Sequence, residues 1–337
     1  MQYHYAIELG GSFTTIYVKN VGFALKEPTM VAVDNNEEGY RVCAFGKEAK
    51  KLLWKTKDSV EVFNPISSGV IENFEYTKVM MEHFLSKVGF KKNKQNAIIL
   101  IPCGLSAKDR KEYYKLFDAL GFLSVDLVPS VMASAIGCGC NIASTKANMI
   151  VNIGGTTTDI AVINLSSIIQ GVSLGIGGKQ IDVAIANTLA LPKNGENKRI
   201  LVGVPTAERI KNDIGSLYKN DTSKMEVMGV DINTKTPKAR VVTAQEIRPV
   251  IVAFFEEILR TIDVSINTLQ PEISADILKN CIYFSGGLSK IAGFEEFLRA
   301  NLPYPFEIIE NPEDVTILGA GKLLNDSELL TKVLKNC

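Results

Sequence analysis

Two glycine-centred segments of this chain resemble each other, and this internal repeat limits the possible folds more than any other feature. Residues 7–18 read IELGGSFTTIYV, and residues 151–162 read VNIGGTTTDIAV. The equivalent positions are Glu8 and Asn152, Gly10 and Gly154, Gly11 and Gly155, and Thr14 and Thr158. Each segment has an apolar run, a polar residue, a Gly-Gly pair followed by hydroxyl residues, and an alternating run. This pattern predicts two β-hairpins with glycine at the bend.

The residue types in these bends suit the binding of phosphate. Glycine lets backbone N–H groups approach an anion closely, and consecutive N–H groups at a turn form a concave anion site. Serine and threonine hydroxyls add donors, and a carboxylate or amide at the strand end can hold the water shell of Mg²⁺. The pair of hairpins predicts two related domains that close on one polyphosphate. Two unrelated Gly-Gly hairpins are the alternative.

A third Gly-Gly turn follows later in the chain. Residues 282–293 read IYFSGGLSKIAG, which predicts a strand, a turn and then a helix that begins near Ser289 or Gly293. A helix start beside a glycine turn suits the phosphate or sugar edge of a nucleotide. Alone this motif says little, but it gains weight as the third such turn.

The size and charge of the chain narrow the class of protein. A chain of 337 residues exceeds the size at which one hydrophobic core usually stops growing, so two domains are expected. Lys plus Arg and Asp plus Glu number 37 each, which argues against a nucleic-acid-binding protein. The N-terminus lacks the features of a signal peptide, and no run approaches the roughly 18 apolar residues of a membrane span. We therefore expect a cytoplasmic protein.

The six cysteines are scattered along the chain without a CxxC pair, and the chain has only two histidines. Structural zinc sites need closely spaced cysteine and histidine ligands, so we expect none here. Reduced cytosolic thiols are the simplest interpretation.

Strand and helix signals alternate between the glycine motifs. Residues 97–103 and 123–128 are short apolar runs that predict buried strands. Capping-box spacings at 106–109 and 243–246 predict the starts of two helices. The second helix carries an apolar stripe at helical spacing: Ile247, Ile251, Phe254, Ile258 and Ile262. The alternation predicts α/β domains with covered sheets, and the polar interval 193–240 is a candidate inserted subdomain.

The order of these motifs resembles that of the actin, hexokinase and Hsp70 ATPase superfamily. Within it, the whole chain resembles MreB, the bacterial actin, as a divergent paralogue of the Spiroplasma type. The stretches that carry the resemblance are EPTMVAV at 27–33, FGKEAKKLL at 45–53, NPISSGVIENFE at 64–75, IPCGLSAKDR at 101–110, TAERIKNDIGSLY at 206–218 and DVTILGAGKLL at 314–324.

This resemblance implies an actin-like α/β fold of two duplicated ribonuclease-H-like domains, each with an inserted subdomain and with a nucleotide cleft between them. Domain I would comprise 1–145 and 313–337, with its insert at about 30–75. Domain II would comprise 146–312, with its insert at about 182–243. The helix at 206–218 would lie in that second insert.

The resemblance also implies roles for particular residues in binding ATP or ADP with Mg²⁺. The phosphates would be wrapped from domain I by Gly10, Gly11, Ser12 and Thr14, and from domain II by Gly154, Gly155, Thr156, Thr157 and Thr158. The adenosine would be flanked by Gly286, Gly287 and Leu288. Glu8 and Asn152 would hold Mg²⁺ through water. Glu208 and Lys211 would contact the ribose hydroxyls, although a solvated helix pair contributing about 0.2–0.5 kcal/mol is the alternative.

Several positions depart from the family pattern. The phosphate hairpins of the family begin with aspartate, whereas this chain has Glu8 and Asn152, so we expect Mg²⁺ to be held less strongly. Phe13 replaces the usual asparagine and removes a polar contact to phosphate. Leu288 replaces a glycine and is expected to crowd the base.

The departure with the largest expected effect lies at Pro129 and Ser130. The matching stretch of MreB carries two glutamates, the second of which orients the attacking water. A serine hydroxyl cannot accept a proton near neutral pH, and loss of a general base typically costs about 10²–10⁴ in rate. Thr157 or Thr158 would support any residual hydrolysis. We therefore expect ATP binding with very slow turnover.

A lysine-rich segment, KVGFKKNK at 87–94, is a candidate contact with the membrane. Val88 and Phe90 would insert, while each lysine contributes about 1 kcal/mol near anionic headgroups. The lysines are Lys87, Lys91, Lys92 and Lys94. On this interpretation the protein lies at the inner face of the cell membrane. A solvated loop is the alternative.

The resemblance implies a cytoskeletal filament protein for cell shape or motility, with itself and other bacterial actin paralogues as partners. A non-polymerising paralogue that binds active bacterial actins is an alternative. A sugar kinase would need a catalytic aspartate after the strand that ends in LVPS, and none stands there. A chaperone-type ATPase would carry a peptide-binding domain, whereas this sequence ends soon after LGAGKLLND.

Overall fold

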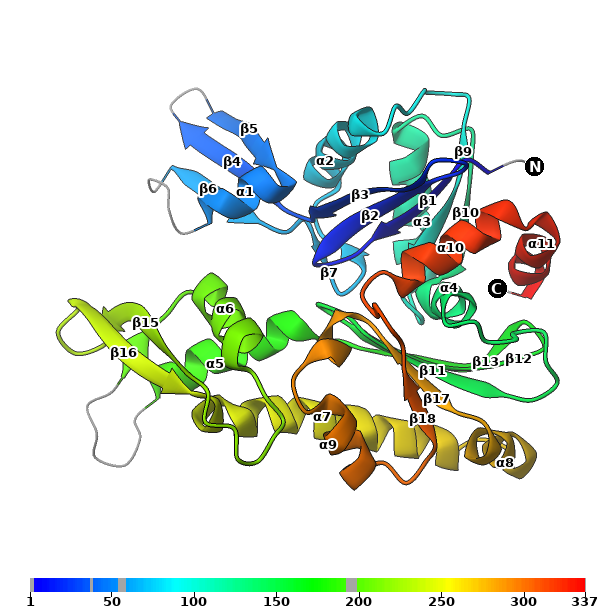
Figure 1. The fold of residues 1–337 in the computed structure, drawn as a ribbon. Coiled ribbons are helices and arrows are strands. Elements are labelled where there is room, and N and C mark those ends of the chain that lie inside the picture. The colour runs from blue at the N-terminus through cyan, green and yellow to red at the C-terminus, as the bar shows by residue number, and fades with distance from the viewer. Residues whose placement is uncertain (1–2, 37–38, 54–58, 192–198, 337) are drawn as a thin grey trace.

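The computed structural model describes residues 3–36, 39–53, 59–191 and 199–336. Its elements form two lobes that meet along α4 (Ser130–Gly137) and α10 (Val315–Asn325), as Figure 1 shows. Each lobe contains one large sheet, and a smaller sheet extends from each lobe at the same end of the molecule.

The first lobe is built on a five-stranded sheet with the order β10-β9-β1-β2-β3. Its strands are β1 (Tyr5–Leu9), β2 (Phe13–Val18), β3 (Gly22–Pro28), β9 (Asn96–Ile101) and β10 (Ser124–Pro129). β1 and β2 form the predicted antiparallel hairpin, while β9 lies parallel to both β1 and β10. β9 is buried throughout, as expected of a central parallel strand. It ends at Ile101, two residues before the prediction, because Pro102 has no N–H group for the ladder.

The second lobe repeats this arrangement. Its sheet has the order β13-β12-β11-β17-β18. The strands are β11 (Asn148–Ile153), β12 (Thr158–Asn164), β13 (Ser167–Leu174), β17 (Ile282–Ser285) and β18 (Phe306–Ile308). β11, β12 and β13 form an antiparallel meander, and β17 lies parallel to β11 and β18. Strand directions therefore match those of the first sheet one by one, which confirms the duplication predicted from the glycine repeat.

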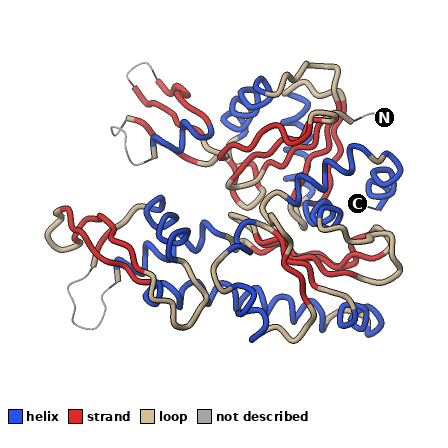
Figure 2. The backbone as a smooth tube through the Cα atoms, viewed as in Figure 1, coloured by secondary structure: helices blue, strands red, loops and turns tan. Residues whose placement is uncertain are grey.

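Helices cover both sheets, and Figure 2 shows how they separate into layers. The helices outside the first sheet are α2 (Phe74–Lys87) and α3 (Ala107–Ala119). The helices that pack on the second sheet are α5 (Gly178–Ala190), α7 (Ala244–Asn267), α8 (Pro271–Lys279) and α9 (Phe294–Asn301). α11 (Ser327–Asn336) joins α4 and α10 in a core shared by the two lobes. Side chains along β1 alternate between two cores, because Tyr5 and Ile7 face the outer helices while Ala6 faces the core shared by the lobes.

Both predicted capping boxes begin helices. The Ser106 hydroxyl accepts from the Asp109 N–H at 3.1 Å before α3, and the Thr243 hydroxyl accepts from the Glu246 N–H at 3.3 Å before α7. Such side-chain caps satisfy N–H groups that have no partner inside the helix. The starts of α3 and α7 are therefore confirmed.

The apolar stripe of α7 needs one correction. Ile247, Ile251, Ile258 and Ile262 are buried as predicted. Phe255, not Phe254, completes the stripe: Phe255 is 1% exposed, whereas Phe254 is only partly buried. The observed buried positions advance by four, four, three and four residues, and the predicted ones by four, three, four and four. Both sets fit one face of a helix with 3.6 residues per turn, so the tertiary packing and not the period selects Phe255.

Two small sheets stand at the edge of the opening between the lobes (Figure 1). One contains β4 (Val31–Asn36), β5 (Gly39–Phe45) and β6 (Val60–Phe63) beside α1 (Gly46–Leu52); the other contains β14 (Ile200–Leu201), β15 (Lys224–Asp231) and β16 (Pro237–Thr243) beside α6 (Val204–Ile214). The short pair β7 (Ile66–Ser67) and β8 (Val70–Ile71) leads from the first of them to α2. These sheets lie within the two intervals predicted for inserts.

α6 occupies residues 204–214 and not the predicted 206–218. Pro205 stands in its first turn, where a missing N–H group costs nothing. The helix ends before Gly215, and Ser216 instead pairs with Ala292 ahead of α9.

The joint between the lobes is tightly packed. A Cβ atom on Gly319 of α10 would lie 1.9 Å from the carbonyl oxygen of Ala133 in α4. A Cβ atom on Gly137 would lie 2.2 Å from the carbonyl oxygen of Val315. Glycine is needed at both positions because the two helix backbones approach each other directly.

Candidate functional site

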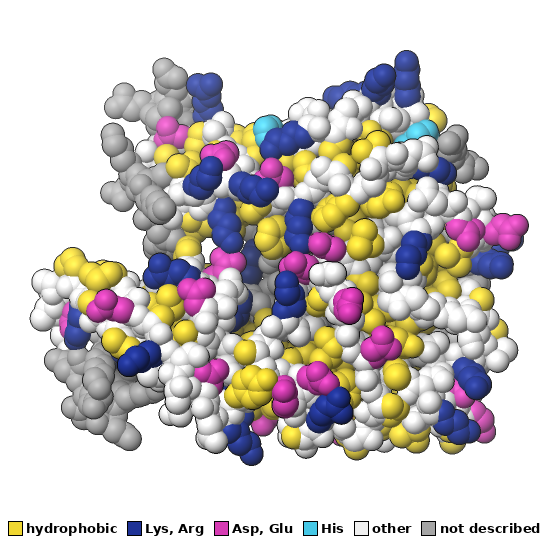
Figure 3. All heavy atoms as spheres, viewed as in Figure 1, with side chains coloured by type: hydrophobic (Ala, Val, Ile, Leu, Met, Phe, Trp, Pro, Cys, Tyr) yellow, Lys and Arg dark blue, Asp and Glu magenta, His cyan; other side chains and the backbone are white. Residues whose placement is uncertain are grey.

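A cavity of about 460 Å³ opens between the two lobes and is lined by residues of both. Lysine and carboxylate side chains gather where the lobes meet on the face shown in Figure 3. The predicted site residues that line the cavity are Glu8, Gly10, Gly11, Ser12, Ser130, Asn152, Gly154, Gly155, Thr156, Thr157, Glu208, Lys211, Gly286, Gly287 and Leu288. The structure therefore brings together residues that are far apart in the sequence.

Two predicted phosphate contacts, Thr14 and Thr158, do not line this cavity. Both are fully buried. The Thr14 hydroxyl lies 3.0 Å from the Thr29 hydroxyl, and the Thr158 hydroxyl donates to the Ile176 carbonyl oxygen at 2.8 Å. Side-chain alternation along β2 and β12 turns these equivalent residues inward. Their placement argues against contact with phosphate and leaves Thr157 as the threonine available for residual hydrolysis.

The two glycine bends face each other reciprocally. A Cβ atom on Gly11 would lie 2.3 Å from the Thr156 hydroxyl oxygen, and a Cβ atom on Gly155 would lie 1.9 Å from the Ser12 hydroxyl oxygen. Because the glycine of each bend has no side chain, there is room beside it for the hydroxyl group of the opposite bend. Inside the bends, equivalent bonds recur, from Gly10 N–H to Phe13 O at 3.1 Å and from Gly154 N–H to Thr157 O at 2.8 Å.

A lysine missed at the sequence level lies between these bends. Lys179, in the first turn of α5, reaches from the second lobe and donates to the Gly11 carbonyl oxygen of the first lobe at 2.5 Å. Burial lowers the pKa of Lys179 from 10.5 to about 8. The sequence does contain a signal for it, since Gly177, Gly178 and Lys179 form another Gly-Gly turn at a helix start.

The predicted ribose pair already has partners. Glu208 on α6 forms an ion pair at 2.9 Å with Lys50 on α1, which bridges the two small subdomains. Lys211 forms a buried ion pair with Asp182 at 2.7 Å and donates to the Gly178 carbonyl oxygen at 3.0 Å. Neither side chain is an unpaired charge: Lys211 is 10% exposed and Glu208 is 34% exposed.

Carboxylates with raised pKa values lie where β1 and β11 end. Burial, with a smaller contribution from the charge of Asp159, raises the pKa of Glu8 to about 7, although a 3.1 Å bond from the Thr15 hydroxyl opposes the shift. Burial also raises the pKa of Asp159 to about 6. Asp159 stands opposite Asn152 in the hairpin, so the second hairpin keeps a carboxylate on its other strand. These oxygen atoms are hard donors of the kind that Mg²⁺ prefers.

The shift at Asp159 predicts a dependence of stability on pH. Its folded pKa of about 6 exceeds its ordinary value of 3.8, so the folded state binds more protons between these values and the free energy of unfolding falls as pH rises through that window. Two pKa units correspond to about 3 kcal/mol. We expect Asp159→Asn to raise the free energy of unfolding at pH 7.5 by about 1–3 kcal/mol, as measured by denaturant unfolding.

Asp118→Asn, an exposed site on α3, is the control and should change little. The gain from Asp159→Asn should shrink at pH 4.5, where the folded wild-type carboxyl is already protonated. A loss of stability at pH 7.5 would contradict this prediction and would show that the ionised carboxylate stabilises the folded protein, because the amide oxygen of asparagine can still accept the bond from the Cys103 N–H.

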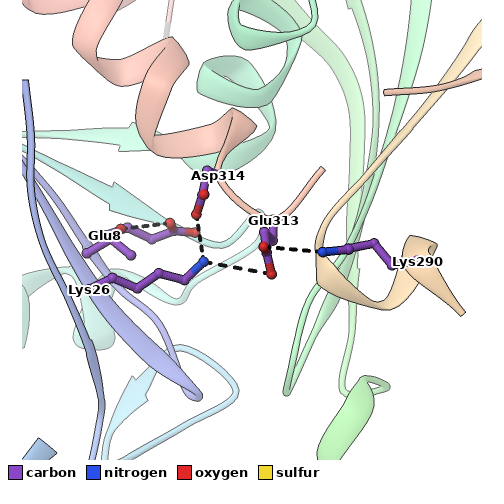
Figure 4. Close-up of polar contacts among 6 residues, drawn as sticks. Glu8, Lys26, Lys290, Glu313 and Asp314 are labelled. Atoms are coloured by element: carbon purple, nitrogen blue, oxygen red, sulfur yellow. Dashed lines mark hydrogen bonds and ion pairs between the residues drawn. The ribbon is translucent and has the colours of Figure 1, made fainter. Parts of the chain in front are cut away.

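An ion-pair network crosses from one lobe to the other beside Glu8 (Figure 4). Lys26 on β3 contacts Asp314 at 2.6 Å and Glu313 at 3.8 Å, and Glu313 also contacts Lys290 of the second lobe at 3.4 Å. The Lys26 ammonium lies 5.6 Å from the centre of the Phe13 ring. Phe13 therefore packs on the cation next to the first bend.

The family of the chain follows from comparison with known proteins. A family model described as MreB/Mbl protein matches residues 2–332. The chain belongs to the MreB/Mbl family. It is 30% identical over 329 residues to the cell shape-determining protein Mbl of Bacillus subtilis, covering 97% of each chain. It is 31% identical over 325 residues to the cell shape-determining protein MreB of Escherichia coli, covering 95% of this chain and 92% of the relative.

Solved structures of related proteins confirm the actin-like fold. A crystal structure of MreB5 of Spiroplasma citri bound to ADP has a TM-score of 0.88 and 26% identity, covering 99% of this chain and 98% of that one. A MamK double helical filament has a TM-score of 0.77 at 20% identity, covering 95% and 98%, and this similarity concerns the fold alone. This member of the MreB/Mbl family is thus an actin-like protein of the bacterial cytoskeleton.

Ser130 stands where the resemblance places the water-orienting glutamate of this family. It is the first residue of α4, is 6% exposed and lines the cavity. Its hydroxyl donates to the Ile101 carbonyl oxygen at 3.1 Å. A hydrogen bond to the last residue of β9 therefore fixes the position of the Ser130 hydroxyl group.

The third glycine turn packs against the second bend. Gly286 has φ +89, and a Cβ atom there would lie 2.3 Å from the Ile153 carbonyl oxygen. The turn continues into η1 (Gly287–Lys290), and α9 begins after Gly293, near one of the two predicted positions. Leu288 lines the cavity but is only 8% exposed and packs in the core of the second lobe.

The candidate membrane segment follows α2. Phe90 packs its ring against Tyr5 and Phe122 at centroid distances of 5.8 and 4.3 Å, and Val88 packs against the same core. This packing argues against their insertion into lipid. The segment's four lysines are exposed, with Lys87 bonded to Glu27 and Lys92 near Glu82. None of the helices in the described part of the chain has the length and apolarity of a membrane span.

Proposed function

We propose that this chain binds ATP or ADP between its lobes. The observation that carries the proposal is the reciprocal contact of the two glycine bends, with the Lys179 ammonium between them. A phosphate chain held there would gain N–H and hydroxyl donors from both lobes and one cation. Crystal structures of MreB5 of Spiroplasma citri bound to ADP and to AMPPNP support this proposal.

Each part of the nucleotide would have its own residues. The phosphates would lie between 10–12 and 154–157, the ribose against Glu208 and Lys211, and the adenosine beside 286–288. The nucleotide would then lie between the two domains predicted from the sequence. Domain I comprises 1–145 with 313–337, and domain II comprises 146–312. In support of those boundaries, α10 packs on α4, β1 and β2 of the first lobe.

Magnesium would be held near Glu8, Asn152 and Asp159. Two carboxyl groups with raised pKa values near each other would be stabilised in their ionised form by a cation. No group of three His, Cys, Asp or Glu among the described residues is arranged to bind a metal directly. This fits Mg²⁺ held largely through water. When bound, the ion would neutralise charge on the phosphates.

We propose further that hydrolysis is slow and that the protein assembles into filaments for cell shape or motility, with other bacterial actin paralogues as further partners. Ser130 cannot act as a general base, which supports slow turnover. Family membership supports filament formation, and peripheral membrane contact would now rest on the lysines of 87–94 alone. Electron microscopy of the pure protein with and without ATP tests assembly. Nucleotide binding without filaments would favour the non-polymerising alternative.

Lys50→Ala should speed nucleotide release by about 2- to 5-fold. The ion pair between Lys50 and Glu208 bridges the mouth of the cleft, and both side chains are about one-third exposed, at 38% and 34%. Exposed pairs contribute about 1 kcal/mol at most, which corresponds to about a fivefold change. Stopped-flow displacement of a fluorescent ATP analogue measures the rate.

Lys51→Ala is the matched control, because Lys51 pairs with Glu48 within the same helix at 2.7 Å. Its release rate should equal that of the wild type. Slower release from Lys50→Ala would contradict the bridge and would show that Lys50 competes with the ribose for Glu208.

A further inference from the structure

Two of the scattered cysteines meet at the end of α4. Cys138 caps the helix, and Gly139 follows with φ +81. The Gly139 N–H donates to the Ile136 carbonyl oxygen at 3.2 Å, and the Cys140 N–H donates to the Ala135 carbonyl oxygen at 3.0 Å. These two bonds form a Schellman motif, which reverses the chain around a left-handed glycine. The motif turns the chain so that the side chains of Cys138 and Cys140 lie close together, on either side of Gly139.

The two thiols differ in their surroundings. Cys140 packs against the core shared by the lobes and has a side-chain hydrogen bond with Cys138. That hydrogen bond and burial raise the pKa of Cys140, which therefore stays protonated near neutral pH. Both residues are half-buried, so a small reagent can reach them. Cys43 provides a contrast, since it is exposed but its thiol donates to the Ala32 carbonyl oxygen.

We propose that Cys138 and Cys140 are a site of reversible oxidation by a hydroperoxide. The Cys138 thiol loses its proton as its sulfur attacks one peroxide oxygen and the O–O bond breaks. When the oxidant is hydrogen peroxide, the products are a sulfenic acid and a hydroxide, which takes up that proton to become water. The Cys140 thiol then gives up its proton as its sulfur attacks the sulfenic sulfur. The S–S bond forms, the S–O bond breaks, and the hydroxyl group leaves with that proton as a second water. The two thiols lose two electrons and two protons, and the peroxide is reduced to two waters.

The position of this dithiol gives the oxidation a structural consequence. Residues 138–147 are the first of the two connections between the lobes, leading from α4 to β11. Lys322 of α10 donates to the carbonyl oxygens of Ile136 and Gly137 at 3.1 and 3.3 Å, just before Cys138. A disulfide across one intervening residue closes a small, strained ring, and strained disulfides are the readily reduced ones. The disulfide would therefore be a reversible switch in this connection between the lobes and not a permanent cross-link.

Peptide mapping of the full chain tests the proposal. The reduced protein is treated with hydrogen peroxide under native conditions, and free thiols are then alkylated. We expect the peptide carrying residues 138–140 to lose two alkylation sites together and to weigh two hydrogen atoms less than the reduced form. Dithiothreitol should restore it. Stable sulfinic acid at Cys138, or no protection of either thiol, would overturn the proposal.

Cysteine-to-serine variants identify which two thiols form the disulfide. Cys43→Ser and Cys281→Ser should leave the oxidised peptide unchanged, whereas Cys138→Ser or Cys140→Ser should abolish it. Loss of the product in Cys281→Ser would overturn the pairing, because Cys281 lies near the same cluster, beside Tyr283. Mapping the wild-type protein decides the chemistry even if a serine variant fails to fold.

Discussion

Gly155→Ala is expected to lower the affinity for ATP by about 5- to 140-fold. Its Cβ atom would lie 1.9 Å from the Ser12 hydroxyl oxygen, so the two bends could not close as they do now. Overpacking of this kind costs about 1–3 kcal/mol, and 1.4 kcal/mol is tenfold in binding. Isothermal titration calorimetry with AMPPNP and Mg²⁺ measures the change.

Gly175→Ala is the control for this substitution. The nearest atom to its Cβ would be the Ser68 hydroxyl oxygen at 3.9 Å, an ordinary contact distance. Its affinity should match that of the wild type, and both variants should unfold at similar temperatures. Wild-type affinity in Gly155→Ala would mean that the bends do not close on the nucleotide together.

Ser130→Glu is expected to raise the rate of ATP hydrolysis by about 10²–10⁴. Ser130 lines the cavity at the first position of α4, so a longer acidic side chain there would place a carboxylate in the cleft. Such a group can accept a proton from water, which the serine hydroxyl cannot do near neutral pH. Phosphate release from the pure protein gives the rate.

Ser130→Gln separates the effect of the base from that of side-chain length. Glutamine has the size of glutamate but cannot accept the proton, so its rate should stay near that of the wild type. Calorimetry with AMPPNP should show that both variants still bind. Equal rates for the Glu and Gln variants would show that position 130 does not face the attacking water.

The features that the sequence predicts well are local. The two hairpins are encoded by adjacent glycine, hydroxyl and alternating residues, and both appear with matching bonds inside their bends. The starts of α3 and α7 depend on side chains three positions apart. The register of a helix is predicted less well, because tertiary packing decides whether Phe254 or Phe255 is buried.

The features that the sequence does not predict depend on contacts between distant segments. Lys179 meets Gly11 and Lys50 meets Glu208 only because the lobes are closed on each other. Thr14 and Thr158 look like phosphate ligands in the motif, yet strand alternation turns them into the core. The contact of Cys138 with Cys140 likewise requires the left-handed turn at Gly139.

The central claim is that the two duplicated bends hold one nucleotide together. A crystal structure of the protein grown with AMPPNP and Mg²⁺ tests it most directly. We expect the triphosphate to lie between residues 10–12 and 154–157, with the Lys179 ammonium next to it. An empty cleft under saturating AMPPNP, or a nucleotide bound to only one of the two bends, would contradict the claim.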